Sequence, residues 1–127
     1  IADELTVPFH NLGVLYGYNL KEPLKAIPKY RAAIRLNPLN ASFYVGFADF
    51  YRQVAADLPL AKQTLLDGLS NLPKDPNLLI ATASLSNSMG DRSGAIRYYE
   101  EALAVLNPGQ AERAAIIAEL ERLKRMQ

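Results

Sequence analysis

A sequence repeat with a period of 35 residues runs through this 127-residue chain. Small, aromatic and proline residues of the first copy return 35 positions later, and a third copy is one residue shorter between Ser86 and Ala95. A unit of this length cannot bury its apolar face alone, so neighbouring copies must stack against one another. The three copies contain, in order, Leu12, Gly13, Tyr16, Ala26, Tyr30, Ala33 and Pro38; Phe47, Ala48, Tyr51, Ala61, Leu65, Gly68 and Pro73; and Thr82, Ala83, Ser86, Ala95, Tyr99, Ala102 and Pro108.

The apolar residues within each copy recur at spacings of three and four, which is the period of an amphipathic helix. No segment alternates apolar and polar residues for long enough to predict a strand. Asn40, Asp57 and Asp75 each stand where a helix can be capped at its beginning. Pro28 interrupts the second helical segment, where we expect a kink or a later start. The pattern predicts seven helices, over residues 6–18, 23–36, 40–56, 59–71, 76–88, 92–106 and 110–126.

The order of these residues resembles the tetratricopeptide repeat (TPR), a helix–turn–helix unit of about 34 residues. The shared pattern is Leu-Gly-x-x-Tyr in the first helix, Ala-x-x-x-aromatic-x-x-Ala in the second, and a closing Pro; residues 90–102 follow it most closely. The resemblance implies an all-α fold, a right-handed superhelical α-solenoid of antiparallel helix pairs. It makes the chain one domain of three repeats, at about 6–40, 41–75 and 76–109, with a capping helix at about 110–127.

The loops and the two ends of the chain lead to further expectations. The first two copies carry one extra residue between their helices, so we expect longer loops at residues 18–21 and 55–58. The last helix has no partner after it, and a terminal repeat needs a polar outer face. Because the chain begins with Ile1 and lacks an N-terminal cap, we expect it to be a segment of a longer protein. The apolar side of the last helix is expected to consist of Ala111, Ala114, Ile117, Ala118 and Leu120.

The composition argues against several classes of partner and site. The 14 Lys and Arg residues nearly cancel the 13 Asp and Glu residues, and a net charge of +1 gives no strong field for nucleic acid or an anionic membrane. The chain has no cysteine, which removes disulfides, thiolate catalysis and thiolate metal sites. No apolar run approaches the length of about 18 residues that crosses a membrane. A soluble domain of the cytoplasm or of the bacterial periplasm is compatible with these properties.

No catalytic constellation is recognisable in the sequence. His10 is the only histidine, and without a cysteine it would need a hydroxyl nucleophile and an acid brought to it by the fold. Adjacent carboxylates such as Glu100 and Glu101 point about 100° apart on a helix and do not converge. The seven glycines are scattered rather than gathered in a phosphate loop, and there is no calcium loop. We therefore predict a non-catalytic protein without a metal or cofactor.

The resemblance also implies where a partner protein would bind. In TPR proteins the first helix of each repeat contributes to a concave groove that usually holds a peptide or a helix. The carboxylate clamp of one TPR subtype is missing, since its cationic positions correspond here to His10, Asn77 and Ala81. With Val14, Val45 and Ile80 in an apolar strip, we expect the groove to bind an uncharged, partly apolar peptide or helix. The predicted groove residues are His10, Val14, Tyr18, Val45, Asp49, Arg52, Ile80, Ser84 and Asn87.

Two other functions remain open at the level of the sequence. An uncapped first helix would leave Leu5, Phe9 and Leu12 accessible to a neighbour, so the chain could self-associate or serve as a rigid spacer in a longer solenoid. An enzymatic function ranks below both, because the residues of a catalytic site are missing. A protein-binding module with a scaffold or assembly role is the first hypothesis.

Overall fold

The computed structural model describes residues 9–126, and the secondary-structure elements within that range are all helices. A helical segment at residues 9–14 continues into the π-helix η1 (Leu15–Asn19), and six α-helices follow. The all-α prediction is therefore confirmed. The α-helices are α2 (Pro23–Leu36), α3 (Ala41–Gln53), α4 (Leu58–Asn71), α5 (Pro76–Ser88), α6 (Arg92–Val105) and α7 (Ala111–Arg125).

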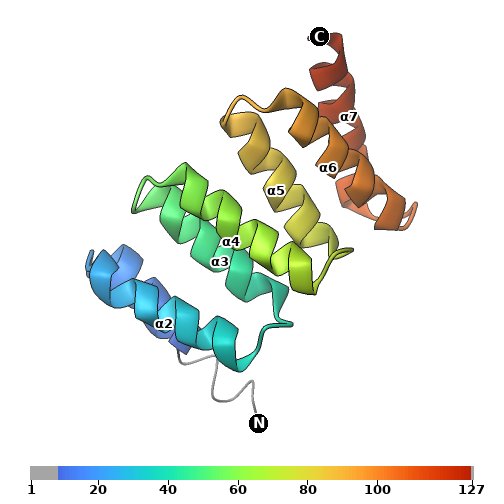
Figure 1. Cartoon of the computed structure of the whole chain (residues 1–127). Helices are drawn as coiled ribbons and strands as arrows, with labels where there is room; N and C mark the ends of the chain where they lie inside the picture. The colour runs from blue at the N-terminus through green and yellow to red at the C-terminus, as the bar shows by residue number, and fades with distance from the viewer. Residues whose placement is uncertain (1–8, 127) are drawn as a thin grey trace.

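The helices form successive antiparallel pairs that stack along one direction, with α2 and α7 at opposite ends of the stack (Figure 1). The segment 9–19 pairs with α2, α3 pairs with α4, α5 pairs with α6, and α7 follows as a single helix. These seven helices correspond to three helix pairs and a cap. The predicted beginning of the first helix at residue 6 lies outside the described residues. No helix in the described range is long and apolar enough to cross a membrane.

Four of the helices begin with a side-chain cap, and the sequence predicts three of these caps. The Asn40 side chain accepts a hydrogen bond from the Ser42 backbone N–H at 3.1 Å. The carboxylates of Asp57, Asp75 and Asp91 each accept one from the backbone N–H three residues ahead, at 3.0, 3.1 and 3.0 Å. Each bond satisfies an N–H group that the first turn of a helix leaves without a partner. Local chemistry thus sets where α3, α4, α5 and α6 begin.

The connection inside each helix pair contains one residue with a left-handed backbone, at equivalent positions of the three repeats. Lys21 and Ala56 both have a φ of 53°, and Gly90 has a φ of 83°. These positions share one place in the repeat, since Lys21 and Ala56 are 35 residues apart and the third copy is one residue shorter. The repeat seen in the sequence therefore extends to the backbone conformation of its turns.

The extra residue of the first two repeats lies in a wide last turn of the helix. The N–H groups of Leu20 and Ala55 bond to carbonyls five residues back, at 2.9 and 3.2 Å, which is the spacing of a π-helix. In the third repeat the N–H of Asp91 bonds to the Ser86 carbonyl, and that of Gly90 to the Asn87 carbonyl, as in a Schellman motif. The longer loops predicted at 18–21 and 55–58 are therefore partly absorbed into the helix ends, and α3 ends at residue 53 rather than 56.

The helix α2 does not start late, contrary to one of the two expectations for Pro28. It begins at Pro23, where a proline is well tolerated in the first turn, and it continues through Pro28 to Leu36. Pro28 lacks the N–H group that would bond to the Leu24 carbonyl. Both residues are exposed, and Leu24 is 86% accessible, so solvent can reach this part of the helix.

Two hydrophobic clusters form the interior, and α5 belongs to both. The first cluster joins α2, α3 and α4, and its aromatic rings include Tyr30 and Phe47, whose centroids lie 5.0 Å apart. The second cluster joins α6 and α7. Leu78 and Leu85 of α5 face the first cluster, whereas Leu79 of α5 faces the second. The interior is therefore a series of layers, as stacked repeats require.

Small residues let the helices of a pair approach closely. A Cβ atom at Gly68 of α4 would lie 2.8 Å from Tyr44 Cγ on α3 and 3.1 Å from Leu78 Cδ2 on α5. A Cβ atom at Gly13 would lie 3.0 Å from the Tyr30 ring. Glycine therefore makes room at both places for a large aromatic ring of the neighbouring helix.

The apolar side predicted for α7 is wrong in register by one residue. Ile116, Leu120 and Leu123 are buried, whereas Ile117 is 40% accessible and the predicted Ala111, Ala114 and Ala118 are exposed. Of the five predicted residues, only Leu120 is buried. The observed positions lie four and three residues apart on one helical face. They bury more apolar surface than the alanine-rich face would, which explains why α7 is rotated this way.

Candidate functional site

A pocket of about 580 Å³ lies between α3 and α5, the first helices of the second and third repeats. It contains four of the predicted groove residues, Val45 and Asp49 from α3 and Ile80 and Ser84 from α5. Residues at i, i+3, i+4 and i+7 share one helical face, and both helices contribute such a set at positions 35 residues apart. The complete lining is Ser42, Val45, Gly46, Asp49, Asn77, Ile80, Ala81 and Ser84.

An ion pair lies beside this pocket. The Arg52 guanidinium is 3.6 Å from the Asp49 carboxylate, and both side chains are partly exposed to solvent. Burial raises the pKa of Asp49, and the charge of Arg52 acts in the opposite direction. Arg52, Asp49 and Ser84 also line a small adjoining cavity of about 80 Å³. The charged part of the groove is thus close to neutral, and an exposed pair of this kind adds little stability.

Three pocket residues occupy positions of the carboxylate clamp in the resembled family. Asn77 and Ala81 stand where the clamp of the third repeat has cations, and Gly46 stands where the second repeat has asparagine. None of these three residues carries a positive charge. The predicted groove residues did not include Gly46 and Ala81, although the clamp comparison pointed to both positions. The pocket therefore has no cation at the places where the clamp would hold a carboxylate.

His10 packs between helices and does not line the pocket. Its ring stacks on Phe43 at a centroid distance of 4.9 Å and meets Tyr30 edge-on at 5.6 Å. A Cβ atom at Gly46 would come within 2.5 Å of His10 Cε1, so glycine makes room for the ring. Burial lowers the pKa of His10, and its Nδ1 atom is buried without a hydrogen-bond partner in the described part of the chain. This residue joins the first repeat to α3.

The other predicted residues lie along the same series of helices but outside the central pocket. Tyr18 is 37% accessible and lines a separate pocket of about 550 Å³ at the turn of the first repeat, together with Gln53 and Val54. Burial raises the pKa of Tyr18, and the Asp49 carboxylate raises it further. Val14 is 36% accessible, and Asn87 is half-buried and lines neither pocket.

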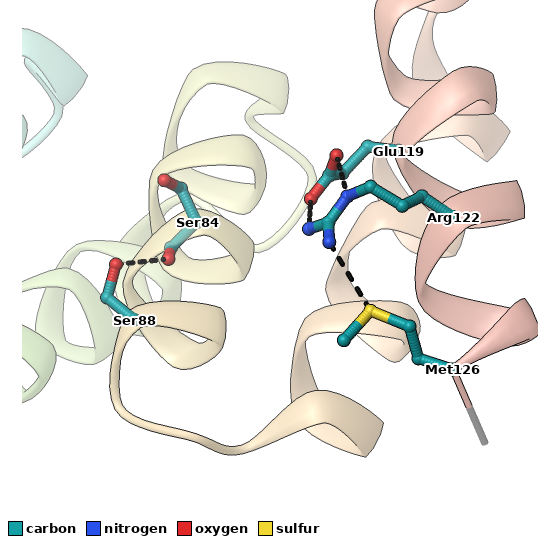
Figure 2. A network of polar contacts seen from close by, with 5 residues as sticks. All are labelled: Ser84, Ser88, Glu119, Arg122 and Met126. Atoms are coloured by element: carbon teal, nitrogen blue, oxygen red, sulfur yellow. Dashed lines mark hydrogen bonds and ion pairs between the residues drawn. The ribbon is translucent and has the colours of Figure 1, made fainter.

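A polar cluster from α7 lies on the side of that helix that faces α5, as Figure 2 shows. Arg122 pairs with Glu119, donating to it from Nε at 3.0 Å, and its Nη1 lies 3.3 Å from the Met126 sulfur. Burial raises the pKa of Tyr99, the Glu119 carboxylate raises it further, and Arg122 and Ser84 lower it. Glu119 and Arg122 were not among the predicted groove residues. Their spacing of three residues was the available signal, because such residues share a helical face.

The described residues offer no site for a metal ion. Among residues 9–126, no group of three or more His, Asp or Glu side chains lies close enough together to hold one. The pocket between α3 and α5 offers apolar contacts and hydroxyl and amide hydrogen-bonding groups, and the Asp49–Arg52 ion pair lies beside it.

The structure resembles solved helical-repeat proteins over nearly its whole length. The N-terminal domain of stress-induced protein-1 (STI-1) from C. elegans is 18% identical, with a TM-score of 0.74, and the match covers 98% of each chain. The first TPR domain of Spaghetti (RPAP3), solved with the HSP90 peptide SRMEEVD, is 15% identical, with a TM-score of 0.76 and coverage of 99% of this chain and 98% of that one. The fold is that of a TPR domain.

A further structural neighbour of this chain is a bacterial chaperone. The type III secretion chaperone SycD of Yersinia enterocolitica, solved in complex with a peptide of the translocator YopD, is 17% identical. Its TM-score is 0.75, and the match covers 97% of this chain and 95% of that one. No protein-family model and no curated protein matches the sequence.

Proposed function

We propose that this TPR domain is a non-catalytic protein-binding module that holds a peptide or helix of a partner protein in the groove between α3 and α5. The observation that carries the proposal is the pocket of about 580 Å³ formed by equivalent faces of the two helices. Its size is that of typical ligand sites. The three repeats, at about 6–40, 41–75 and 76–109, would serve as the rigid frame of the groove, in a scaffold or assembly role.

The structural neighbours support binding of a peptide at this kind of fold. SycD was solved with a peptide of YopD, and the RPAP3 domain with an HSP90 peptide. The second peptide, SRMEEVD, is acidic. The groove here has no cation at Gly46, Asn77 or Ala81, and Asp49 contributes a carboxylate. We therefore propose an uncharged, partly apolar segment as its ligand.

The apolar contacts of such a ligand would come mainly from Val45 and Ile80. Both side chains are only partly buried, so they can contact a ligand without being essential to the interior. Polar hydrogen-bonding groups of Ser42, Asn77 and Ser84 stand beside them and can bond to the backbone of a bound segment. A carboxylate introduced at either apolar position would have to be desolvated when the ligand binds.

A pull-down with matched variants tests the proposal. The wild-type domain and a Val45→Glu/Ile80→Glu variant are used side by side on lysate of the source organism. A Leu24→Glu/Leu39→Glu variant is the control, because it adds the same charge at exposed apolar residues outside the pocket. We expect the groove variant to lose the partner, with affinity reduced about 100-fold or more, while the control retains it. Equal recovery by the groove variant, with unchanged helicity by circular dichroism, would contradict the proposal.

Self-association is the second candidate function, and exposed leucines of the first repeat favour it. Leu15, Leu20 and Leu24 are 42%, 52% and 86% accessible and belong to the first helix pair, which lies at one end of the stack. Such a patch could bury itself against a second copy or a further repeat. Of the residues that the sequence analysis assigned to this layer, Phe9 and Leu12 are half-buried and Leu5 lies outside the described residues. Light scattering at high protein concentration tests this candidate, and a monomer would exclude it.

A further inference from the structure

A further pocket, of about 460 Å³, lies between α2 and α4 on the opposite face of α3 from the proposed groove. Its floor consists of Tyr44, Phe47 and Tyr51 of α3, which are 2%, 5% and 3% accessible. The groove residues Val45 and Asp49 each lie two positions from Phe47, the central residue of this floor, which places them about 200° away from it around the helix. The two pockets are therefore separate sites on one helix.

The α4 wall of this pocket has polar groups that already have partners. The Gln63 side chain donates to the Asp67 carboxylate at 2.9 Å, and the Thr64 hydroxyl donates to the Leu60 carbonyl at 2.8 Å. The Asn71 side chain donates to the Tyr44 hydroxyl at 2.9 Å. The polar groups of this wall are thus largely satisfied within the protein.

The α2 wall differs, because its two cations have no partner within the described residues. Arg31 and Arg35 line the pocket from successive turns of α2, and neither has an ion-pair or hydrogen-bond partner among residues 9–126. By contrast, Lys25 on the same helix pairs with Glu22 at 3.5 Å, and Lys29 lies over the Phe9 ring. A guanidinium offers a planar set of donors that matches a carboxylate. The pocket therefore combines an aromatic floor with two carboxylate-binding groups at its edge that have no partner in the described part of the chain.

From these contacts we infer that the pocket between α2 and α4 binds a carboxylate attached to a flat or branched apolar body. The apolar body lies on Tyr44, Phe47 and Tyr51, and the carboxylate reaches Arg31 and Arg35. Asp67 on the opposite wall repels the carboxylate and so orients the ligand toward α2. The volume is that of a site for one small molecule or one peptide residue. The same chemistry is found in a free aromatic acid and in the last residue of a polypeptide.

An NMR titration of the intact chain tests the inference and distinguishes these two sources. The probes are 3-phenylpropionate and its amide, and the tripeptide acetyl-Ala-Leu-Phe with a free or an amidated carboxyl terminus. We expect saturable shifts of backbone amides in α2 and α4 with at least one of the two acids, and binding about tenfold or more weaker with the matching amide. Binding of only the aromatic acid assigns the site to small acids, and binding of only the tripeptide assigns it to chain termini.

Three variants test whether binding of the acid depends on the two arginines of this pocket. An Arg31→Gln/Arg35→Gln variant should weaken acid binding about as much as the amide does. A Lys25→Gln/Lys29→Gln variant removes the same charge from α2 outside the pocket and should bind like the wild type. The Val45→Glu/Ile80→Glu groove variant should also bind the acid normally, so failure of the groove proposal and failure of this inference are distinguishable. The inference is overturned if neither acid binds, if acid and amide bind equally, or if the arginine variant binds as well as the wild type.

Discussion

Replacing Ala56 by glycine should stabilise this protein, and replacing Gly90 by alanine should destabilise it by a similar amount. The two residues occupy the same place in successive repeats, and both have a left-handed backbone. Ala56 is exposed, and a Cβ atom at Gly90 would meet no heavy atom within 4 Å. Contacts therefore change little in either variant, and the difference in stability comes from the backbone.

The expected size follows from two opposing effects. A residue with a Cβ atom loses about 1–2 kcal/mol in the left-handed conformation, because the Cβ approaches the following carbonyl oxygen. Glycine has the larger conformational entropy in the unfolded chain, which offsets about 0.5–1 kcal/mol of its advantage. The difference predicts a change of about 0.5–1 kcal/mol in the free energy of unfolding, with opposite signs for Ala56→Gly and Gly90→Ala.

Urea denaturation followed by circular dichroism measures this change. With a slope of about 1.5 kcal/mol per molar urea, the midpoint should rise by about 0.5 M for Ala56→Gly and fall by about as much for Gly90→Ala. Gly109→Ala is the control, since its φ is not positive and its Cβ would also meet open space. Alanine should there leave the stability unchanged or raise it slightly. A lower midpoint for Ala56→Gly, or an unchanged one for Gly90→Ala, would refute the reasoning.

Two further predictions concern the interior. Gly68→Ala should lower the free energy of unfolding by about 1–3 kcal/mol, because the new Cβ would lie 2.8 Å from Tyr44 Cγ; a midpoint in urea equal to that of the wild type would contradict this. Burial lowers the pKa of His10 below its ordinary value of 6.5, so the unfolded chain binds this proton more readily than the folded chain. The stability that the neutral His10 ring contributes is therefore complete above pH 6.5. It is lost as the pH falls toward the pKa of His10 in the folded chain, by at most about 1.4 kcal/mol per pH unit. The His10→Gln variant should lose this part of the pH dependence below pH 6.5, and an identical pH profile would show that another group is responsible.

The sequence predicts the helices and four residues that line the pocket between α3 and α5, because both follow from the spacing of residues along the chain. Asp57 and Asp75 cap helices through bonds that span three residues, so their role is visible without the fold. Val45 and Ile80 share the pocket because residues 35 positions apart in a stacked repeat occupy equivalent places. Asp49 and Ser84 follow from the same rule.

Other features depend on contacts that local spacing does not fix. Ile116 and Ile117 are adjacent and equally apolar, so only packing against α6 decides which of them is buried. His10 does not line the pocket between α3 and α5, because its ring stacks on Phe43 and fills the space that Gly46 leaves beside it. The pocket between α2 and α4 arises from the distance between two helices that are not adjacent in sequence. The period of the repeat does not determine which of these side chains are buried or how far apart α2 and α4 lie.

The position of α5 in both hydrophobic clusters has a consequence for how the molecule opens. In an array where each layer contacts only its neighbours, segments can unfold separately, and hydrogen exchange then reports more than one opening free energy. The side of α5 that carries Leu78 and Leu85 belongs to the first half of the molecule, and the side that carries Leu79 belongs to the second. Loss of α5 exposes both halves, whereas loss of α7 exposes only one. A segment bound across α3 and α5 would therefore slow exchange on both sides of the boundary and make the array unfold more nearly as a single cooperative unit.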